Sequence, residues 1–175
     1  MIDFPLYLIT DRKQVANGHT LYTAVEAALQ GGVKAVQLRE KDLSTAELLP
    51  LATQLRDLTR SHGALLFIND NIDIALAVEA DGVHLGGHSE ATEVIRTKVE
   101  EKMLIGVSTH SKEEIERAAK QGADFVTFGP VYATPSKAKY GEPQGLKELS
   151  KACRNSSIPV FALGGITPER ATEVQ

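Results

Sequence analysis

The sequence has few of the features that several protein classes depend on. Cys153 is the single cysteine among 175 residues, so an internal disulfide is excluded, and no partner stands at metal-ligand spacing from it. We expect Cys153 to be structural. The chain has no run of lysine or arginine, and its formal net charge is −4. A nucleic-acid partner is therefore not expected, and any anion site has to be a local pocket.

Long apolar runs are also missing. The longest uncharged apolar stretches, such as 64–68 and 159–163, are far shorter than the roughly 20 residues of a membrane-spanning helix. The N-terminus has no secretory pattern. The hydrophobic content of 42% is enough for one buried core. We expect one domain over residues 1–175, located in the cytoplasm and without a membrane partner.

Short apolar and β-branched segments alternate with helical patterns along the chain. Ser44 and Glu47 form a capping-box pattern at the start of one predicted helix. Three turns, Gly31-Gly32, Ala80-Asp81-Gly82 and Gly122-Ala123-Asp124, each precede a strand and form a weak internal repeat. The seven predicted strands are residues 6–10, 35–40, 65–70, 82–86, 104–109, 125–131 and 159–165. This alternation predicts an α/β fold with a parallel sheet.

The positions of the polar residues separate two parallel folds. A doubly wound sheet often has a G-x-G-x-x-G turn after its first strand, whereas Asp11-Arg12-Lys13 stands there in this chain. A (β/α)8 TIM barrel builds its site from many strand ends at once. Polar or glycine residues lie at or just after the C-terminal ends of most of the predicted strands, namely Arg39, Lys41, Asn69, Asp70, His84, Ser108, His110, Thr134, Ser136, Lys137, Gly164 and Gly165. We therefore predict a TIM barrel.

The segment Gln37-Leu38-Arg39-Glu40-Lys41 ends an apolar strand. Because side chains alternate across a strand, Gln37, Arg39 and Lys41 are expected on one face. A guanidinium group binds phosphate oxygens bidentately, and an ammonium group adds a point charge. These residues are suited to clamp a phosphorylated substrate, although a solvated edge strand explains them equally well when they are taken alone.

Two later loops are also suited to phosphate. Gly164-Gly165 precedes a predicted helix that has Thr167 as N-cap and Pro168 at its first position, and glycine lets backbone N–H groups approach an anion. The loop that begins with residues 134–137 carries two hydroxyl groups and a lysine. The alternatives are a simple strand-to-helix turn for the first loop and a surface loop for the second.

Asp70 offers carboxylate oxygens to a hard cation at the end of the third predicted strand. Mg²⁺ is commonly held by one or two carboxylates together with substrate phosphates. The run Asn69-Asp70-Asn71 is also a good helix cap, so the pattern alone does not decide. For His84 and His110, structural hydrogen bonding is favoured slightly over catalysis.

In order and spacing, these motifs resemble the family of thiamine phosphate synthase and its paralogue, the thiazole tautomerase. The motifs extend over essentially the whole chain and are Gln37–Lys41, Asn69-Asp70, Asp81–Gly86, Gly106–Ser108, Gly129–Tyr132, Thr134–Lys137, Gln144-Gly145 and Gly164–Ile166. The resemblance implies a (β/α)8 barrel that joins hydroxymethylpyrimidine diphosphate to a thiazole phosphate and releases pyrophosphate.

The resemblance also implies roles for individual residues. Those matching the pyrimidine diphosphate site are Gln37, Arg39, Lys41, Asn69, Ser108 and Lys137, and those matching the thiazole phosphate site are Thr134, Ser136 and Gly165. Asp70 matches an Mg²⁺ ligand. Arg39, Lys41 and Lys137 would then be catalytic, because with Mg²⁺ they would stabilise the negative charge that develops on the departing pyrophosphate.

The sequence departs from the family pattern in three places. Ser89 replaces the aspartate that is the second Mg²⁺ ligand, and we interpret it as the N-cap of a helix from Glu90 onward. Pro130 stands where the tautomerase has its catalytic histidine. An eighth strand and helix are expected to be missing at the C-terminal end, and open strand edges would favour a homo-oligomer.

We therefore predict a thiamine phosphate synthase-type transferase of thiamine biosynthesis. The first alternative is an isomerase of a thiazole carboxylate phosphate that uses His110 or His84 as its base. The second is a non-catalytic barrel that binds thiazole phosphate or thiamine phosphate.

Overall fold

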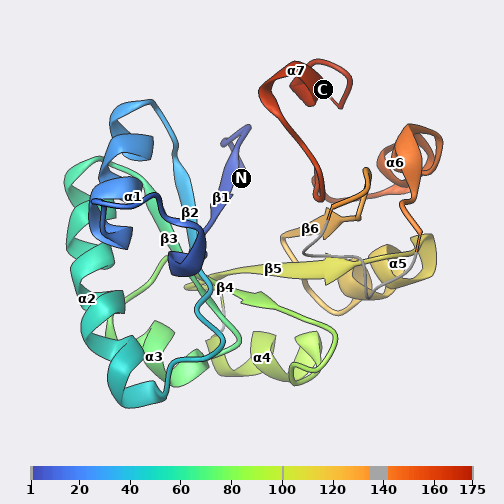
Figure 1. The fold of residues 1–175 in the computed structure, drawn as a ribbon. Helices are drawn as coiled ribbons and strands as arrows, with labels where there is room; N and C mark the ends of the chain where they lie inside the picture. The colour runs from blue at the N-terminus through green and yellow to red at the C-terminus, as the bar shows by residue number, and fades with distance from the viewer. Residues whose placement is uncertain (1, 100, 135–141, 175) are drawn as a thin grey trace. The chain divides into compact units, whose positions relative to one another are not determined.

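Strands and helices alternate along the chain in the computed structural model, which describes residues 2–99, 101–134 and 142–174 (Figure 1). The chain divides into two compact units. Unit 1 is Met1–His84 with Val99–Leu104, and unit 2 is Leu85–Lys98 with Ile105–Gln175. Over the described residues, none of the helices combines the length and the apolar character needed to cross a bilayer.

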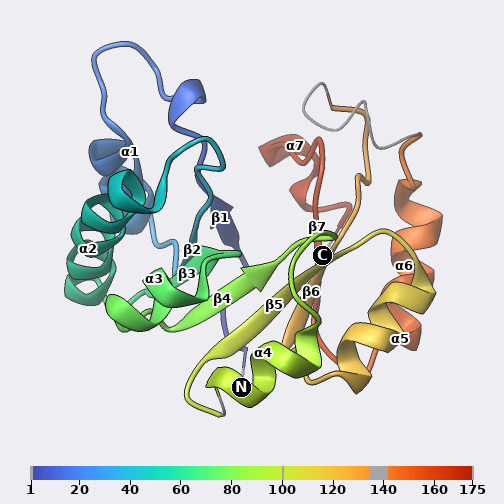
Figure 2. The ribbon, with the colours of Figure 1, turned by 90° about the horizontal axis from the view of Figure 1, so that it is seen from below.

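Unit 1 contains parallel strands in chain order with helices between them. Its strands are β1 (Tyr7–Ile9), β2 (Ala35–Leu38), β3 (Leu65–Asn69) and β4 (Gly82–Leu85). The connecting elements are the 3₁₀ helix η1 (Arg12–Gln14), α1 (Leu21–Gln30), α2 (Thr45–Ser61) and α3 (Ile72–Ala77). Helices α1 and α2 lie on one side of β2 and β3 (Figures 1 and 2). All four residues of β2 are buried, as expected for a parallel strand covered on both faces.

Unit 2 repeats the same alternation. It contains α4 (Thr92–Val99), β5 (Leu104–Thr109), α5 (Lys112–Lys120), β6 (Phe125–Phe128), α6 (Gly145–Asn155), β7 (Val160–Ala162) and α7 (Pro168–Ala171). Helices α5 and α6 lie side by side next to β6 and β7 (Figure 2). Ile115 and Ala118 of α5 and Leu149 and Ala152 of α6 pack with Val126 of β6 in one apolar core.

The repeated turn in the sequence has a common structure in the two units. Asp81 Oδ2 accepts hydrogen bonds from the backbone N–H of Leu66, at 2.7 Å, and from the Arg56 guanidinium, at 2.6 Å. Asp124 Oδ2 accepts hydrogen bonds from the backbone N–H of Ile105 in β5, at 2.7 Å, and from the Arg96 guanidinium, at 2.5 Å. Each aspartate therefore ties the start of its own strand to the neighbouring strand and to the helix that precedes that neighbouring strand, α2 for Asp81 and α4 for Asp124.

All seven predicted strands are present, but most of them end earlier than predicted. The β2 ladder ends at Leu38 because the backbone N–H of Arg39 donates to the Thr10 hydroxyl at 2.9 Å. After β6, Pro130 has no N–H group with which to continue a ladder. The residues that follow Leu38 and Phe128 therefore lie in loops instead of continuing the strands.

The prediction that Ser89 caps a helix from Glu90 onward is wrong. Helix α4 begins at Thr92. Ser89 Oγ accepts the backbone N–H of Gly86 at 2.6 Å, and its own N–H donates to the Gly86 carbonyl at 3.1 Å. Ser89 thus closes the turn after β4, while Glu90 pairs with Lys98 at 2.6 Å.

Candidate functional site

The predicted site residues fall into one group in each unit. Unit 1 contains Gln37, Arg39, Lys41, Asn69 and Asp70, and unit 2 contains Ser89, Ser108, Thr134, Gly164 and Gly165. Ser136 and Lys137 lie outside the described residues.

Strand alternation places only part of the predicted clamp. Gln37 lies within β2, but Arg39 and Lys41 follow the end of the strand. A turn begins there, in which the backbone N–H of Leu43 donates to the Glu40 carbonyl at 3.1 Å. The expected common strand face therefore does not extend to Lys41, whose side chain is exposed, whereas Arg39 is half-buried.

Gln37 belongs to a buried polar network. Its side chain is almost fully enclosed, with 1% of the residue exposed, and Nε2 donates to the Tyr7 hydroxyl at 3.2 Å. The same hydroxyl lies 3.4 Å from Nδ1 of the buried His84. Burial raises the pKa of Tyr7 well above its usual value, so the phenol stays neutral. The network fixes the orientation of the Gln37 amide.

Lys41, Asn69 and Asp70 come together after β2 and β3. Leu38 and Ile68 are opposite each other in the parallel ladder, so the residues that follow them leave the sheet side by side. Lys41 Nζ lies 3.9 Å from Asp70 Oδ2, which also accepts from Asn69 Nδ2 at 2.7 Å. Over the described residues, no group of three or more histidine, cysteine or acidic side chains forms a metal cluster.

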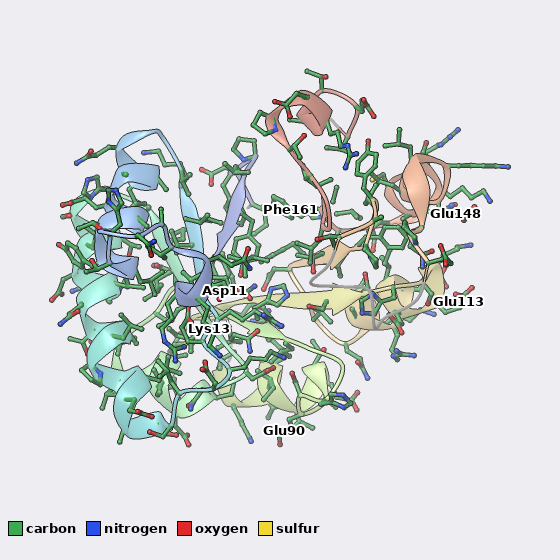
Figure 3. The ribbon with its side chains drawn as sticks, in the orientation of Figure 1. Asp11, Lys13, Glu90, Glu113, Glu148 and Phe161 are labelled. Atoms are coloured by element: carbon green, nitrogen blue, oxygen red, sulfur yellow. The ribbon has the colours of Figure 1, made fainter. Side chains whose placement is uncertain are left out.

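Glu40 is a residue of this region whose role the sequence did not reveal. It is 5% exposed and accepts hydrogen bonds from Thr10 Oγ1 at 2.8 Å and from the Arg12 backbone N–H and Nη1 at 3.1 and 3.0 Å. Arg12 also binds both oxygens of Asp42, at 2.6 and 2.9 Å. Figure 3 labels Asp11 and Lys13, which flank Arg12 in the loop after β1. The run Asp11-Arg12-Lys13 after the first predicted strand was the sequence feature that could have indicated a charged partner for Glu40.

The charges in this cluster reinforce one another. Hydrogen bonds from Arg12, which has the larger effect, and from Lys13 hold the pKa of Asp42 well below its usual range. Hydrogen bonds to Asp42 and then to Glu40 raise the pKa of Arg12 above its already high value. Asp42 and Arg12 therefore remain charged at neutral pH.

In unit 2, Gly164 and Gly165 lie against a neighbouring loop and have positive φ angles of 96° and 67°. A Cβ atom on Gly164 would lie 2.7 Å from Pro130, and one on Gly165 would lie 2.8 Å from the Tyr132 Cβ. The Tyr132 N–H donates to the Gly164 carbonyl at 3.0 Å. Only glycine fits both positions, because of this close approach and the left-handed backbone.

Helix α7 contacts the second glycine of the pair through Arg170. It begins at Pro168 with Thr167 at the N-cap position, as predicted, although the Thr167 side chain makes no capping hydrogen bond. Arg170 Nη1 donates to the Gly165 carbonyl at 2.9 Å, and its guanidinium lies 4.4 Å from the centre of the Tyr132 ring. Neither Arg170 nor Tyr132 was predicted as a site residue.

Ser108 is half-buried in β5 and lines a cavity of about 300 Å³ together with Ser89 and His110. His110 Nδ1 lies 2.5 Å from the Gly129 carbonyl oxygen, and the His110 backbone N–H donates to a Glu114 carboxylate oxygen at 2.6 Å. His110 thus connects the end of β5 to the loop after β6.

Comparison with known proteins gives a consistent result over the length of the chain. The family model described as thiamine monophosphate synthase matches residues 6–175. A relative from Geobacter sulfurreducens, provisionally named thiamine-phosphate synthase, is 56% identical over 165 residues, which are 94% of this chain and 77% of that protein. Thiamine-phosphate synthase 1 of Aquifex aeolicus is 42% identical over 173 residues, 99% of this chain and 80% of that protein.

Solved structures show the same relationship. Thiamine phosphate pyrophosphorylase from Pyrococcus furiosus superposes with a TM-score of 0.85 at 39% identity, over 96% of this chain and 78% of that chain. An N-acetylmannosamine-6-phosphate 2-epimerase from Clostridium perfringens superposes with a TM-score of 0.67 at 16% identity, over 96% of this chain and 80% of the epimerase, and shows the fold alone. The predicted α/β fold of TIM-barrel type is confirmed.

Proposed function

The chain belongs to the thiamine monophosphate synthase family, and we propose that it is a thiamine-phosphate synthase of thiamine biosynthesis. This transferase joins hydroxymethylpyrimidine diphosphate to a thiazole phosphate and releases pyrophosphate. The observation that carries the proposal is the 42% identity to thiamine-phosphate synthase 1 of Aquifex aeolicus over 173 residues.

We assign the diphosphate to the cations that follow β2. Pyrophosphate departs with the electron pair of the broken C–O bond, so negative charge develops on it before the thiazole nitrogen attacks the pyrimidine cation. Arg39, Lys41 and Lys137 are the catalytic residues in this proposal, because cations placed at the developing charge lower the barrier. In the family pattern, Gln37, Asn69 and Ser108 also match residues that bind this substrate. The exposure of Lys41 beside Asn69 and Asp70 supports the assignment.

An exposed carboxylate of unit 1 supports the proposal of a magnesium ion that is shared with the substrate. Asp70 presents an exposed carboxylate next to Lys41 and Asn69, and Mg²⁺ commonly takes one or two carboxylates plus phosphate oxygens. We propose Asp70 as the protein ligand, with Ser89 at the position of the second ligand in the family pattern. When bound, the ion would neutralise charge on the diphosphate.

We assign the thiazole phosphate to the loops of unit 2. Gly164 and Gly165 have no side chain that would keep an anion from the backbone, and their positive φ angles turn the chain sharply there. Thr134 and Ser136 would add hydroxyl donors. Both substrates are small phosphorylated molecules, and the proposal needs no nucleic acid or membrane. Cytoplasmic location, a single domain over residues 1–175 and a homo-oligomeric state remain predictions.

The direct test is to incubate the chain with hydroxymethylpyrimidine diphosphate, thiazole phosphate and Mg²⁺ and to quantify thiamine phosphate by chromatography. We expect thiamine phosphate and pyrophosphate in equal amounts, and no product after chelation of Mg²⁺. The matched control is Arg39→Ala. If the chain binds thiazole phosphate but forms no more product than Arg39→Ala does, the transferase proposal is wrong. Conversion of a thiazole carboxylate phosphate would then indicate the isomerase.

A further inference from the structure

The backbone of Arg39 is fixed by one buried threonine. The Thr10 hydroxyl accepts the backbone N–H of Arg39 at 2.9 Å and donates to the Glu40 carboxylate at 2.8 Å. Thr10 is 4% exposed, and its own N–H donates to the Gln37 carbonyl at 2.9 Å. Thr10 therefore holds the chain at three points, at Gln37 within β2 and at Arg39 and Glu40 just after it.

The Glu40 side chain holds the segment after β2 in one orientation relative to the loop after β1. Only 2% of its side chain is exposed, and its remaining hydrogen bonds come from the Arg12 backbone N–H and guanidinium. A buried carboxylate that leaves its partners is strongly unfavourable. Glu40 therefore stays turned toward the β1 loop, and this orientation determines how the chain runs through its neighbours Arg39 and Lys41.

Cations and anions alternate over residues 39–42, and Arg12 binds the two anions. Arg39 and Lys41 are cations, whereas the residues that follow each of them, Glu40 and Asp42, are anions. Both anions bind Arg12, with N–O distances of 3.0 Å for Glu40 and 2.6 Å for Asp42. Carboxylates that are occupied by Arg12 compete less with a ligand for the two clamp cations.

We propose that Thr10, Arg12 and Glu40 are positioning residues for the diphosphate-bearing substrate. They hold the backbone at Arg39 and Lys41 in the conformation that presents both cations to diphosphate oxygens, and they keep Glu40 and Asp42 away from those cations. The inference rests on the proposed function for the identity of the substrate, and it adds three residues that act through the clamp.

The sharpest test is the pair Thr10→Val and Thr10→Ser. Valine has nearly the volume of threonine but removes both hydroxyl hydrogen bonds, whereas serine keeps them. We expect Thr10→Val to raise the KM for the pyrimidine diphosphate about tenfold, with the KM for thiazole phosphate unchanged. For Thr10→Ser, the KM for the pyrimidine diphosphate is expected to stay within about threefold of that of the unmodified protein.

Glu40→Gln has a matched control in the same unit. Asp81 is another carboxylate that binds an arginine, Arg56, and a backbone N–H, but it lies at the start of β4, opposite the strand ends that carry the clamp. We expect Glu40→Gln to raise the same KM selectively. Asp81→Asn is expected to lower the urea midpoint without changing either KM. A KM effect of Asp81→Asn as large as that of Glu40→Gln would overturn the proposal, because the effect would then be general destabilisation.

Binding of inorganic pyrophosphate, measured by calorimetry, separates this inference from the proposed function. If the unmodified chain binds pyrophosphate and forms no thiamine phosphate, the synthase proposal fails. The positioning role still holds in that case if Thr10→Val and Glu40→Gln weaken pyrophosphate binding about tenfold and Thr10→Ser does not. Equal affinity in Thr10→Val and the unmodified chain overturns it.

Discussion

At the scale of single residues, Arg39 is predicted to act directly on catalysis. Its guanidinium stabilises the departing pyrophosphate in our proposal, so its loss should act on the transition state. We predict that Arg39→Ala raises the barrier by about 2 to 4 kcal/mol, which lowers kcat by a factor of about 30 to 900. Single-turnover kinetics with saturating substrates would measure this change.

Two further variants test the same prediction. Lys137→Ala should cost a similar amount, since the lysine has the same proposed role. Arg39→Lys keeps the charge but loses bidentate geometry, so an intermediate rate is expected. A loss of less than about threefold in Arg39→Ala would contradict a role at the developing charge.

Ser89 allows a test of the magnesium proposal. Its hydroxyl accepts the Gly86 N–H in the turn after β4, and an aspartate side chain could accept the same hydrogen bond with one oxygen. We predict that Ser89→Asp increases the affinity for Mg²⁺, because it adds a second carboxylate. The measurement is the Mg²⁺ dependence of the synthase rate, with Ser89→Asn as the uncharged control. An unchanged Mg²⁺ requirement in Ser89→Asp would count against this account of the site.

At the scale of elements, the start of α2 shows how a local pattern stabilises one helix. Ser44 Oγ accepts the Glu47 N–H, and the Glu47 carboxylate accepts the Ser44 N–H and hydroxyl. The hydrogen bond from the Ser44 side chain, which has the larger effect, and the one from its backbone N–H lower the pKa of Glu47. We predict that Ser44→Ala lowers the free energy of unfolding by about 1 kcal/mol at pH 7.

The effect of this cap should depend on pH in a defined direction. Because the folded pKa of Glu47 is lower than the unfolded value near 4.5, its contribution is present above that value and is lost as the pH falls through the folded pKa. The difference in urea midpoint between the unmodified chain and Ser44→Ala should therefore narrow below about pH 4. Ser44→Thr keeps the cap and should behave like the unmodified chain at every pH. A difference that stays constant down to pH 2 would exclude this linkage.

At the scale of the whole molecule, the prediction of a single domain can be tested with the two aspartates of the repeated turn. Asp81 lies in unit 1 and Asp124 in unit 2, and each binds an arginine and a backbone N–H in the same way. Their matched structures make Asp81→Asn and Asp124→Asn comparable perturbations of the two units.

If residues 1–175 unfold as one domain, either substitution should lower the midpoint of one common transition, by about 2 kcal/mol in unfolding free energy. Far-UV and near-UV circular dichroism in urea should then report coincident curves for both variants. Two separate transitions, of which each variant shifts only one, would show that the units unfold independently.

Local sequence patterns were enough to predict the order of the elements and the class of the fold. Apolar alternation, capping residues and glycine turns act over a few neighbouring residues, so the seven strands and the caps at Ser44 and Thr167 could be predicted. The polar residues at the strand ends indicated the region of the site for the same reason. Strand ends were less predictable, because the β2 ladder stops where a distant hydroxyl takes the Arg39 N–H.

The side chains that support the candidate site residues could be identified only from the folded structure. Glu40 meets Thr10 and Arg12 from about thirty positions away, and Arg170 meets Tyr132 across a similar separation. Such pairs depend on strand register and loop packing, which leave no periodic signal in the chain. Ser89 shows the same limit, since a serine before a helix suggests a cap, whereas its hydroxyl closes the turn after β4. Local chemistry therefore predicted a candidate site at the strand ends, and long-range pairing determines what holds the candidate residues in position.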